Sequence, residues 1–170
     1  MYHLANQKPP GAFATSLLMF VLLAGLAAIA QSATPLLAEQ AVPRTLLGTW
    51  TGTSTCVGDR PACKNETVVY RFVPVEGHAT QIRQLADKII DGKRIPMGAL
   101  VFDYDGKTGT IRSEFTRGQT HAVWSFSVAE DTIKGTLVIL PEGSVVRDVM
   151  VHRVTDDKVP PAPPLSQYDQ

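Results

Sequence analysis

The sequence predicts an all-β fold, an antiparallel eight-stranded up-and-down barrel, with a β-sandwich as the alternative. Polar and apolar residues alternate with period two through most of residues 45–155, and sustained helical periodicity is absent there. Turn signals rich in Gly, Pro and Asp separate the alternating runs at spacings of roughly ten residues. Because a meander of eight strands hides its edges best by closing on itself, the barrel is favoured over the sandwich.

The first two predicted strands flank a pair of cysteines. The stretch Leu46–Cys56, LLGTWTGTSTC, places Trp50 on one face and a row of threonines on the other, and a second strand is expected over Thr67–Val73. Between them, Cys56 and Cys63 enclose VGDRPA, whose Gly, Asp and Pro fold the chain back on itself. In an oxidising compartment these cysteines are expected to form a disulfide, which contributes roughly 2–3 kcal/mol in the chain-entropy estimate.

The middle of the chain predicts a long hairpin. A less regular run over 78–90 ends at Asp91-Gly92, a pair typical of a type I′ turn between two strands. The next run, 94–104, contains Pro96 and Gly98, which indicate an edge, a bend or a bulge in its early part. Its later part aligns three large apolar residues on one face, Leu100, Phe102 and Tyr104.

Four further strands complete the predicted meander, over 110–116, 120–128, 132–140 and 145–154. The run 120–128 alternates most regularly and directs one face inward, with Ala122, Trp124, Phe126 and Val128. The alternation does not assign the facing of 145–154.

Both ends of the chain lie outside the predicted barrel, 45–155. An uncharged apolar run from Leu17 to Ala30 ends in an A-x-A sequence and predicts a signal peptide, 1–30, cleaved near Ala30, with a secreted or periplasmic product. The alternative is an uncleaved anchor, which is the one way in which a membrane would be involved. Residues 31–44 are expected to be a linker, and the proline-rich 156–170 a disordered or extended tail.

Charge and motif spacing argue against several function classes. Sixteen basic and 16 acidic residues give no basic field for nucleic acid. Asp103–Glu114 matches a calcium loop at its ends, but Lys107 stands where an oxygen ligand is needed, so a solvated hairpin is the better interpretation. His78, His121 and His152 lack metal-ligand spacing, and no serine elbow or phosphate loop is present. No catalytic residue, metal or cofactor is therefore predicted, and an enzyme is not expected.

Large aromatic side chains on the inward faces are the candidate ligand-binding residues. An eight-stranded barrel is wide enough either to be filled by side chains or to hold one small ligand, so a packed core and an apolar cavity both remain open. The residues are Trp50, Tyr70, Phe72, Phe102, Tyr104, Phe115, Trp124 and Phe126.

The motif Gly48-Thr49-Trp50, at the start of an eight-strand meander, resembles the G-x-W signature of the calycin superfamily, which contains lipocalins, fatty-acid-binding proteins and avidins. This resemblance implies that Trp50 plugs one barrel end and that Gly48 permits close approach. With the signal-peptide pattern and the inward aromatic rings, the sequence thus predicts an exported, lipocalin-like binding module whose candidate ligand is a small apolar or amphipathic molecule. The alternative is a solid-core domain that binds a protein partner, so far unknown, through its outer face or its tail.

Overall fold

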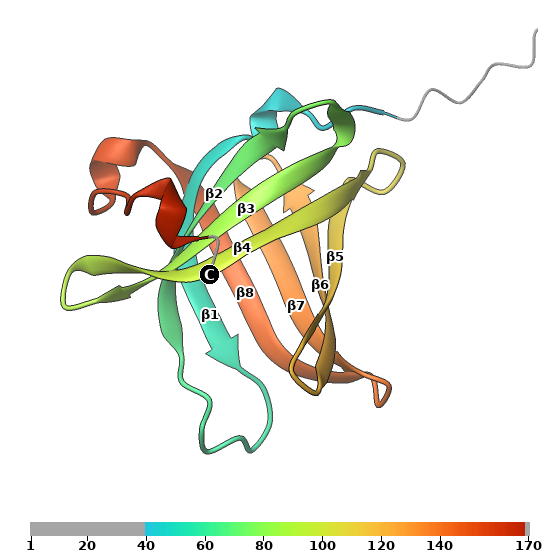
Figure 1. Ribbon diagram of the computed structural model, residues 1–170, viewed down its shortest axis with the longest axis vertical. Helices are drawn as coiled ribbons and strands as arrows, with labels where there is room; N and C mark the ends of the chain where they lie inside the picture. The colour runs from blue at the N-terminus through green and yellow to red at the C-terminus, as the bar shows by residue number, and fades with distance from the viewer. Residues whose placement is uncertain (1–39, 169–170) are drawn as a thin grey trace, which may run out of the picture. The chain divides into compact units, whose positions relative to one another are not determined.

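The computed structural model describes residues 40–168, and these form a closed antiparallel barrel of eight strands (Figure 1). Each strand pairs with the next, and the last pairs with the first, so the predicted barrel is confirmed. The predicted signal peptide lies outside the described residues, and among these no helix is long and apolar enough to cross a membrane. The strands are β1 (Gly48–Cys56), β2 (Glu66–Val75), β3 (His78–Ile90), β4 (Lys93–Asp105), β5 (Thr110–Arg117), β6 (Thr120–Ala129), β7 (Thr132–Leu140) and β8 (Ser144–Val154).

The strand register decides which side chains point into the barrel. Trp50 lies opposite Tyr70 of β2 and Arg153 of β8, so these three share the inner face. Register also settles the facing of β8, which the sequence left open. Its inward residues are Arg147, Val149, Val151 and Arg153. The buried apolar core consists of Leu46, Trp50, Val68, Tyr70, Phe72, Ile82, Phe102, Ile111, Phe126, Ile133, Val149 and Val151.

The β3–β4 hairpin has the turn and the irregularity that its sequence predicts. Asp91 and Gly92 both have positive φ, 49° and 72°, as a type I′ turn requires. The β3–β4 register shifts after Ala86, opposite Gly98 and Pro96, so the predicted bulge is confirmed. Gly98 has a φ of 122°, which favours glycine because a side chain would be strained there.

Neighbouring strands β4 and β5 are joined over a short length. Only three residue pairs connect them, Asp103–Arg112, Tyr104–Ile111 and Asp105–Thr110, whereas β5 and β6 pair along their whole length. In Figure 1 the two strands meet at their shared turn and then run apart. The first part of β4 continues to pair with β3 as far as Lys93, so it leaves the barrel wall together with β3.

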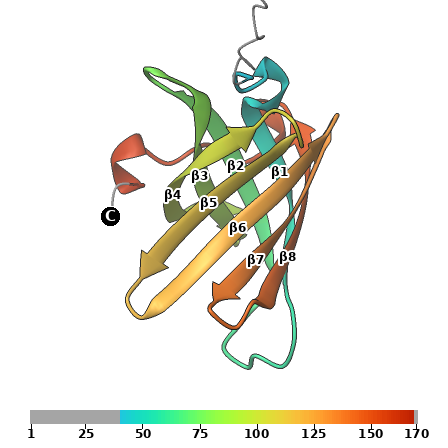
Figure 2. The ribbon, with the colours of Figure 1, turned by 90° about the vertical axis from the view of Figure 1, so that its right-hand side faces the viewer.

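The C-terminal segment lies beside the β3–β4 side of the barrel in both ribbon views (Figures 1 and 2). Composition predicts a disordered or extended tail over 156–170. The structure describes this segment as far as Tyr168, with two short 3₁₀ turns, η2 (Asp156–Lys158) and η3 (Leu165–Gln167). Tyr168 is buried, and its hydroxyl donates to the carboxylate of Asp87 on the outward face of β3. One anchoring side chain therefore fixes a segment whose composition alone cannot build a core.

Candidate functional site: a pocket in the barrel wall

One end of the barrel is closed by apolar packing around Trp50. The 3₁₀ turn η1 (Arg44–Leu46) places Leu46 across this end, and both Leu46 and Trp50 are fully buried. The indole N–H of Trp50 donates to the carbonyl oxygen of Leu46 at 3.1 Å, so the ring is buried without an unpaired donor. We call this region the apolar end.

Arg153 completes the apolar end from the last strand. Its guanidinium carbon lies 4.3 Å from the centroid of the Trp50 ring, and its Nη1 donates to the carbonyl oxygen of Leu47 at 2.8 Å. Gly48 has a φ of 115°, and a Cβ atom there would lie 3.2 Å from Arg153 Nη1. The expected roles of Trp50 as a plug and of Gly48 as a point of close approach agree with this geometry.

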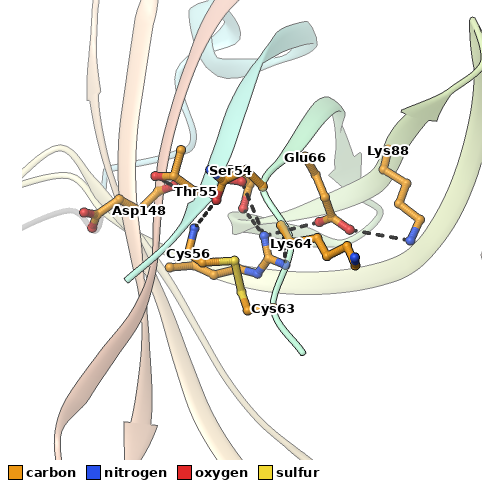
Figure 3. Close-up of polar contacts among 10 residues, drawn as sticks. Ser54, Thr55, Cys56, Cys63, Lys64, Glu66, Lys88 and Asp148 are labelled. Atoms are coloured by element: carbon orange, nitrogen blue, oxygen red, sulfur yellow. Dashed lines mark hydrogen bonds and ion pairs between the residues drawn. A yellow bond between two sulfur atoms is a disulfide. The ribbon is translucent and has the colours of Figure 1, made fainter. Parts of the chain in front are cut away.

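A polar network lies at the opposite end of the barrel and is shown in Figure 3; we call this region the polar end. Arg147 Nη1 donates to Ser54 Oγ at 2.9 Å and lies 3.3 Å from Glu66 Oε2. The other carboxylate oxygen of Glu66 lies 3.5 Å from Lys88 Nζ. These side chains come from four consecutive strands of the barrel, β8, β1, β2 and β3, so the network ties neighbouring strands together.

The predicted disulfide between Cys56 and Cys63 is present and borders the polar end (Figure 3). Arg147 Nη2 also donates to the carbonyl oxygen of Lys64, just after the disulfide loop, at 3.1 Å. Tyr70 is close enough to the network for Arg147 to affect its pKa. Burial of the Tyr70 hydroxyl is the largest effect and raises this pKa, whereas the positive charge of Arg147 lowers it. The Tyr70 hydroxyl is therefore neutral over the physiological range.

A pocket of about 340 Å³ lies where β4 and β5 part, and we call it the lateral pocket. This volume falls at the lower end of the range for small-molecule sites, about 300–1,000 Å³. Its walls come from β2 to β6 and from the C-terminal segment. The lining residues are Tyr70, Gln84, Ala86, Met97, Gly98, Ala99, Leu100, Phe115, Thr116, Arg117, Trp124 and Tyr168.

The polar side chains that line the lateral pocket include Gln84 and Arg117, which have no partner among the described residues. Gln84 is only 3% exposed, yet its carboxamide makes no hydrogen bond within residues 40–168, and its Nε2 is buried. Arg117, at the end of β5, is exposed and likewise makes no ion pair or hydrogen bond in the described part of the chain. An unpaired buried amide costs about 1–3 kcal/mol, so Gln84 is a group that a ligand can satisfy.

Tyr168 forms the wall of the lateral pocket that comes from the C-terminal segment. Its hydroxyl lies 2.8 and 2.9 Å from the two oxygens of Asp87, which is fully buried. Arg94 holds the same carboxylate, with its Nε donating to Oδ2 at 2.7 Å. Burial, and then the hydrogen bond to Asp87, raise the pKa of Tyr168 to about 12.

The eight predicted aromatic residues line the lateral pocket, the core, or both. Tyr70, Phe115 and Trp124 line the lateral pocket, while Tyr70 also belongs to the buried core and Trp124 packs against it. Tyr104 packs against the core from the side, and the other four lie fully or almost fully buried in it. Those four are Trp50, Phe72, Phe102 and Phe126. The barrel thus has a packed core, and the lateral pocket is a separate hollow in its wall.

Sequence reasoning missed Gln84, Met97, Arg117 and Tyr168. A signal for Gln84 exists, because it lies on the same face of β3 as the buried Ile82, where a polar residue is unusual. Arg117 and Tyr168 gave no such signal. Each lies at the end of an element, and only the tertiary fold brings them to the pocket.

The histidines and carboxylates considered in the sequence, among them His121 and Asp105, are not part of the lining of the lateral pocket. His121 Nε2 lies 2.8 Å from Glu114 on the outer surface, and Arg112 also binds that carboxylate. Hydrogen bonds from Arg112 first and His121 second lower the pKa of Glu114. Asp105 caps the β4–β5 turn through Lys107 N–H, as expected for a solvated hairpin. No group of three or more potential metal ligands occurs within residues 40–168.

A second hollow lies on the outside of the barrel, over β1, β6, β7 and β8. Half of its lining residues carry short hydroxylated side chains, among them Thr53, Thr55, Ser125 and Ser127. It contains no buried polar group without a partner. We therefore take the lateral pocket, which combines aromatic walls with an unpaired buried amide, as the candidate site.

Comparison with known proteins assigns no family to the chain. No protein-family model matches the sequence, and no curated protein matches it either. A function must therefore be argued from the pocket itself.

Proposed function

We propose that this protein is an exported binding module that holds one small amphipathic molecule in the lateral pocket. The observation that carries the proposal is the buried, unpaired carboxamide of Gln84 in a pocket with aromatic walls. Binding sites for small molecules are typically apolar hollows with a few polar groups that orient the ligand. The lateral pocket has this composition.

The parting of β4 from β5 supports entry through the side of the barrel. At the apolar end, Leu46 and Trp50 are fully buried and fill the interior. Side chains therefore occupy that end, whereas β4 and β5 share only three residue pairs, which opens the wall between them. A ligand would enter through that opening and contact Trp124 and Leu100.

Export is part of the proposal. Its support is the signal-peptide pattern that ends at Ala30 and the disulfide between Cys56 and Cys63, because disulfides persist in oxidising compartments. Relationship to the calycin superfamily is likewise proposed, from the Gly48-Thr49-Trp50 motif on β1 of a closed eight-stranded barrel. No chemical step is proposed, since the titratable groups in the lining are Tyr70, Tyr168 and Arg117.

A fluorescence titration with 1-anilinonaphthalene-8-sulfonate tests the proposal. The chain has two tryptophans, and Trp50 is fully buried in the apolar end. We expect the bound probe to quench Trp124 selectively, so the quenching is lost in Trp124→Phe and retained in Trp50→Phe. Native mass spectrometry of the purified protein should also detect a co-purifying small molecule.

A cavity-filling variant provides the matched control. Ala86→Phe places a ring in the lateral pocket and should abolish probe binding without lowering the melting temperature. Ala129→Leu, at the exposed end of β6, should bind the probe like the wild type. Probe binding that is unchanged in Ala86→Phe would contradict a site in the lateral pocket.

A further inference from the structure

We propose that the ligand of the lateral pocket is a planar aromatic carboxylate with a carbonyl oxygen at the end that enters first. This inference rests on the proposed binding function and specifies the chemical class of the ligand. It follows from three properties of the lining: a free amide deep in the pocket, a free guanidinium at its edge, and a flat aromatic wall.

Gln84 specifies the inner end of the ligand. The side chain is almost completely buried, and its Nε2 has no acceptor among the described residues. A carbonyl oxygen would accept from this N–H and remove the cost of the unpaired donor. An alkyl chain in the same place would leave the donor unpaired, so the tail of a simple fatty acid fits poorly.

Arg117 specifies the outer end. It is exposed, it makes no interaction in the described part of the chain, and it lines the pocket beside Thr116. The described lining contains no acidic side chain that could neutralise it. A guanidinium forms paired hydrogen bonds with a carboxylate, so an anionic group is expected here and a cationic ligand is disfavoured.

Trp124 specifies the shape between these two ends. Its ring is stacked on Phe126, with centroids 5.4 Å apart and an angle of 8° between the planes, so its orientation is fixed by the core. Small residues on β3 and β4, among them Ala86, Gly98 and Ala99, also line the pocket and leave room for a flat ring. Aromatic pairs favour stacked or edge-on contact, which a planar ligand can make with Trp124.

Three related probes separate these contributions in calorimetric titrations of the wild-type protein. 6-Acetyl-2-naphthoate carries both oxygen groups at opposite ends of a planar ring system. 6-Isopropenyl-2-naphthoate has nearly the same shape but no carbonyl, and 2-acetylnaphthalene has no carboxylate. We expect each of the two incomplete probes to bind about tenfold more weakly than the complete one, as the loss of one hydrogen bond or ion pair predicts.

Variants then assign each preference to its residue. Gln84→Met removes the amide at similar length and should abolish the preference for the acetyl over the isopropenyl probe. Arg117→Gln should abolish the preference for 6-acetyl-2-naphthoate over 2-acetylnaphthalene, which lacks the carboxylate. The controls are Gln81→Met, whose side chain binds Asp103 on the outside of the barrel, and Arg44→Gln in η1, and both should keep the wild-type order.

Equal affinity of the wild type for all three probes would overturn the inference. So would preferences that survive in Gln84→Met and Arg117→Gln. If no naphthoate binds while 1-anilinonaphthalene-8-sulfonate still quenches Trp124, the ligand class is wrong and the binding function stands. If neither kind of probe binds, the binding function itself fails. Since the probe series is measured on the wild type, it remains decisive even if a variant does not fold.

Discussion

The two tryptophans of this barrel lie in regions with opposite properties. Trp50, at the apolar end, is fully buried, its N–H donates to Leu46, and Arg153 covers its ring. Trp124 is partly exposed, stacks on Phe126 at the edge of the core and lines the lateral pocket. The same residue type, on the same inward face, closes one region and lines a hollow in the other.

The difference arises from the strands around each ring. At the apolar end, β1 pairs with β2 and β8 without a register shift, and η1 covers the opening. Around Trp124, β4 has left β5 after three residue pairs, so side chains that would fill the interior are spaced apart. Strand pairing, and not the aromatic residues themselves, separates a packed core from a pocket.

Truncation of the two tryptophans should give the largest contrast. Trp50→Ala is expected to lower the free energy of unfolding by about 3–5 kcal/mol, because it leaves a cavity in a closed core. Trp124→Ala should lower it much less and should abolish probe binding. Urea denaturation followed by circular dichroism measures both losses, and losses of equal size would remove the proposed difference between the regions.

Removal of the Tyr168 hydroxyl tests whether the pocket wall depends on the Asp87 anchor. Tyr168→Phe should lower stability at pH 8 by about 1.5–3 kcal/mol, the usual contribution of a hydrogen bond to a charged group. The folded-state pKa of Tyr168 is raised from 10.0 to about 12. The contribution of this hydroxyl is therefore complete below pH 10 and is lost as the pH rises towards 12.

Denaturation curves of wild type and Tyr168→Phe at several alkaline pH values measure this effect. The difference in the free energy of unfolding between the two proteins should become smaller above pH 10. A difference that stays constant to pH 12 would show that the anchor does not depend on the neutral hydroxyl. Trp50→Phe, altered at the apolar end, serves as the control, because its free energy of unfolding should differ from that of the wild type by the same amount over this pH range.

Replacement of one arginine in each region should give the smallest contrast. Arg153→Gln removes the contact with Trp50 and the hydrogen bond to Leu47. We expect this substitution to lower the free energy of unfolding by about 1–2 kcal/mol. Arg117→Gln, whose side chain has no partner in the described residues, should change stability by less than about 0.5 kcal/mol. Thermal unfolding of the two variants measures both effects. A loss of stability in Arg117→Gln larger than about 0.5 kcal/mol would argue that Arg117 has a structural role.

Much of the architecture could be predicted from particular residues. Period-two alternation located all eight strands, Asp91-Gly92 marked a tight turn, and Pro96 and Gly98 marked the bulge in β4. Each of these depends on local backbone preference or on the two-residue repeat of a strand, which a sequence records directly. The Cys56–Cys63 pair was predictable for the same reason, since the loop between them is short.

The candidate site could be predicted only in part. Tyr70, Phe115 and Trp124 were among the expected inward rings, but the sequence did not separate them from the four rings that fill the core. That separation depends on how far β4 pairs with β5, a long-range property. Gln84 stood at a core position without a visible partner, and Tyr168 was assigned to a tail for which composition predicted no fixed place.

The sequence by itself determined the strands, their turns, the disulfide and the inward placement of the aromatic rings, because local patterns of residue type encode these features. Only the tertiary structure decided that Leu46 covers one barrel end, that the wall opens between β4 and β5, and that Gln84, Arg117 and Tyr168 meet there. The physical reason is that a pocket is space left unfilled by residues distant in sequence. Its existence depends on strand register and packing around the whole barrel, which no local pattern contains.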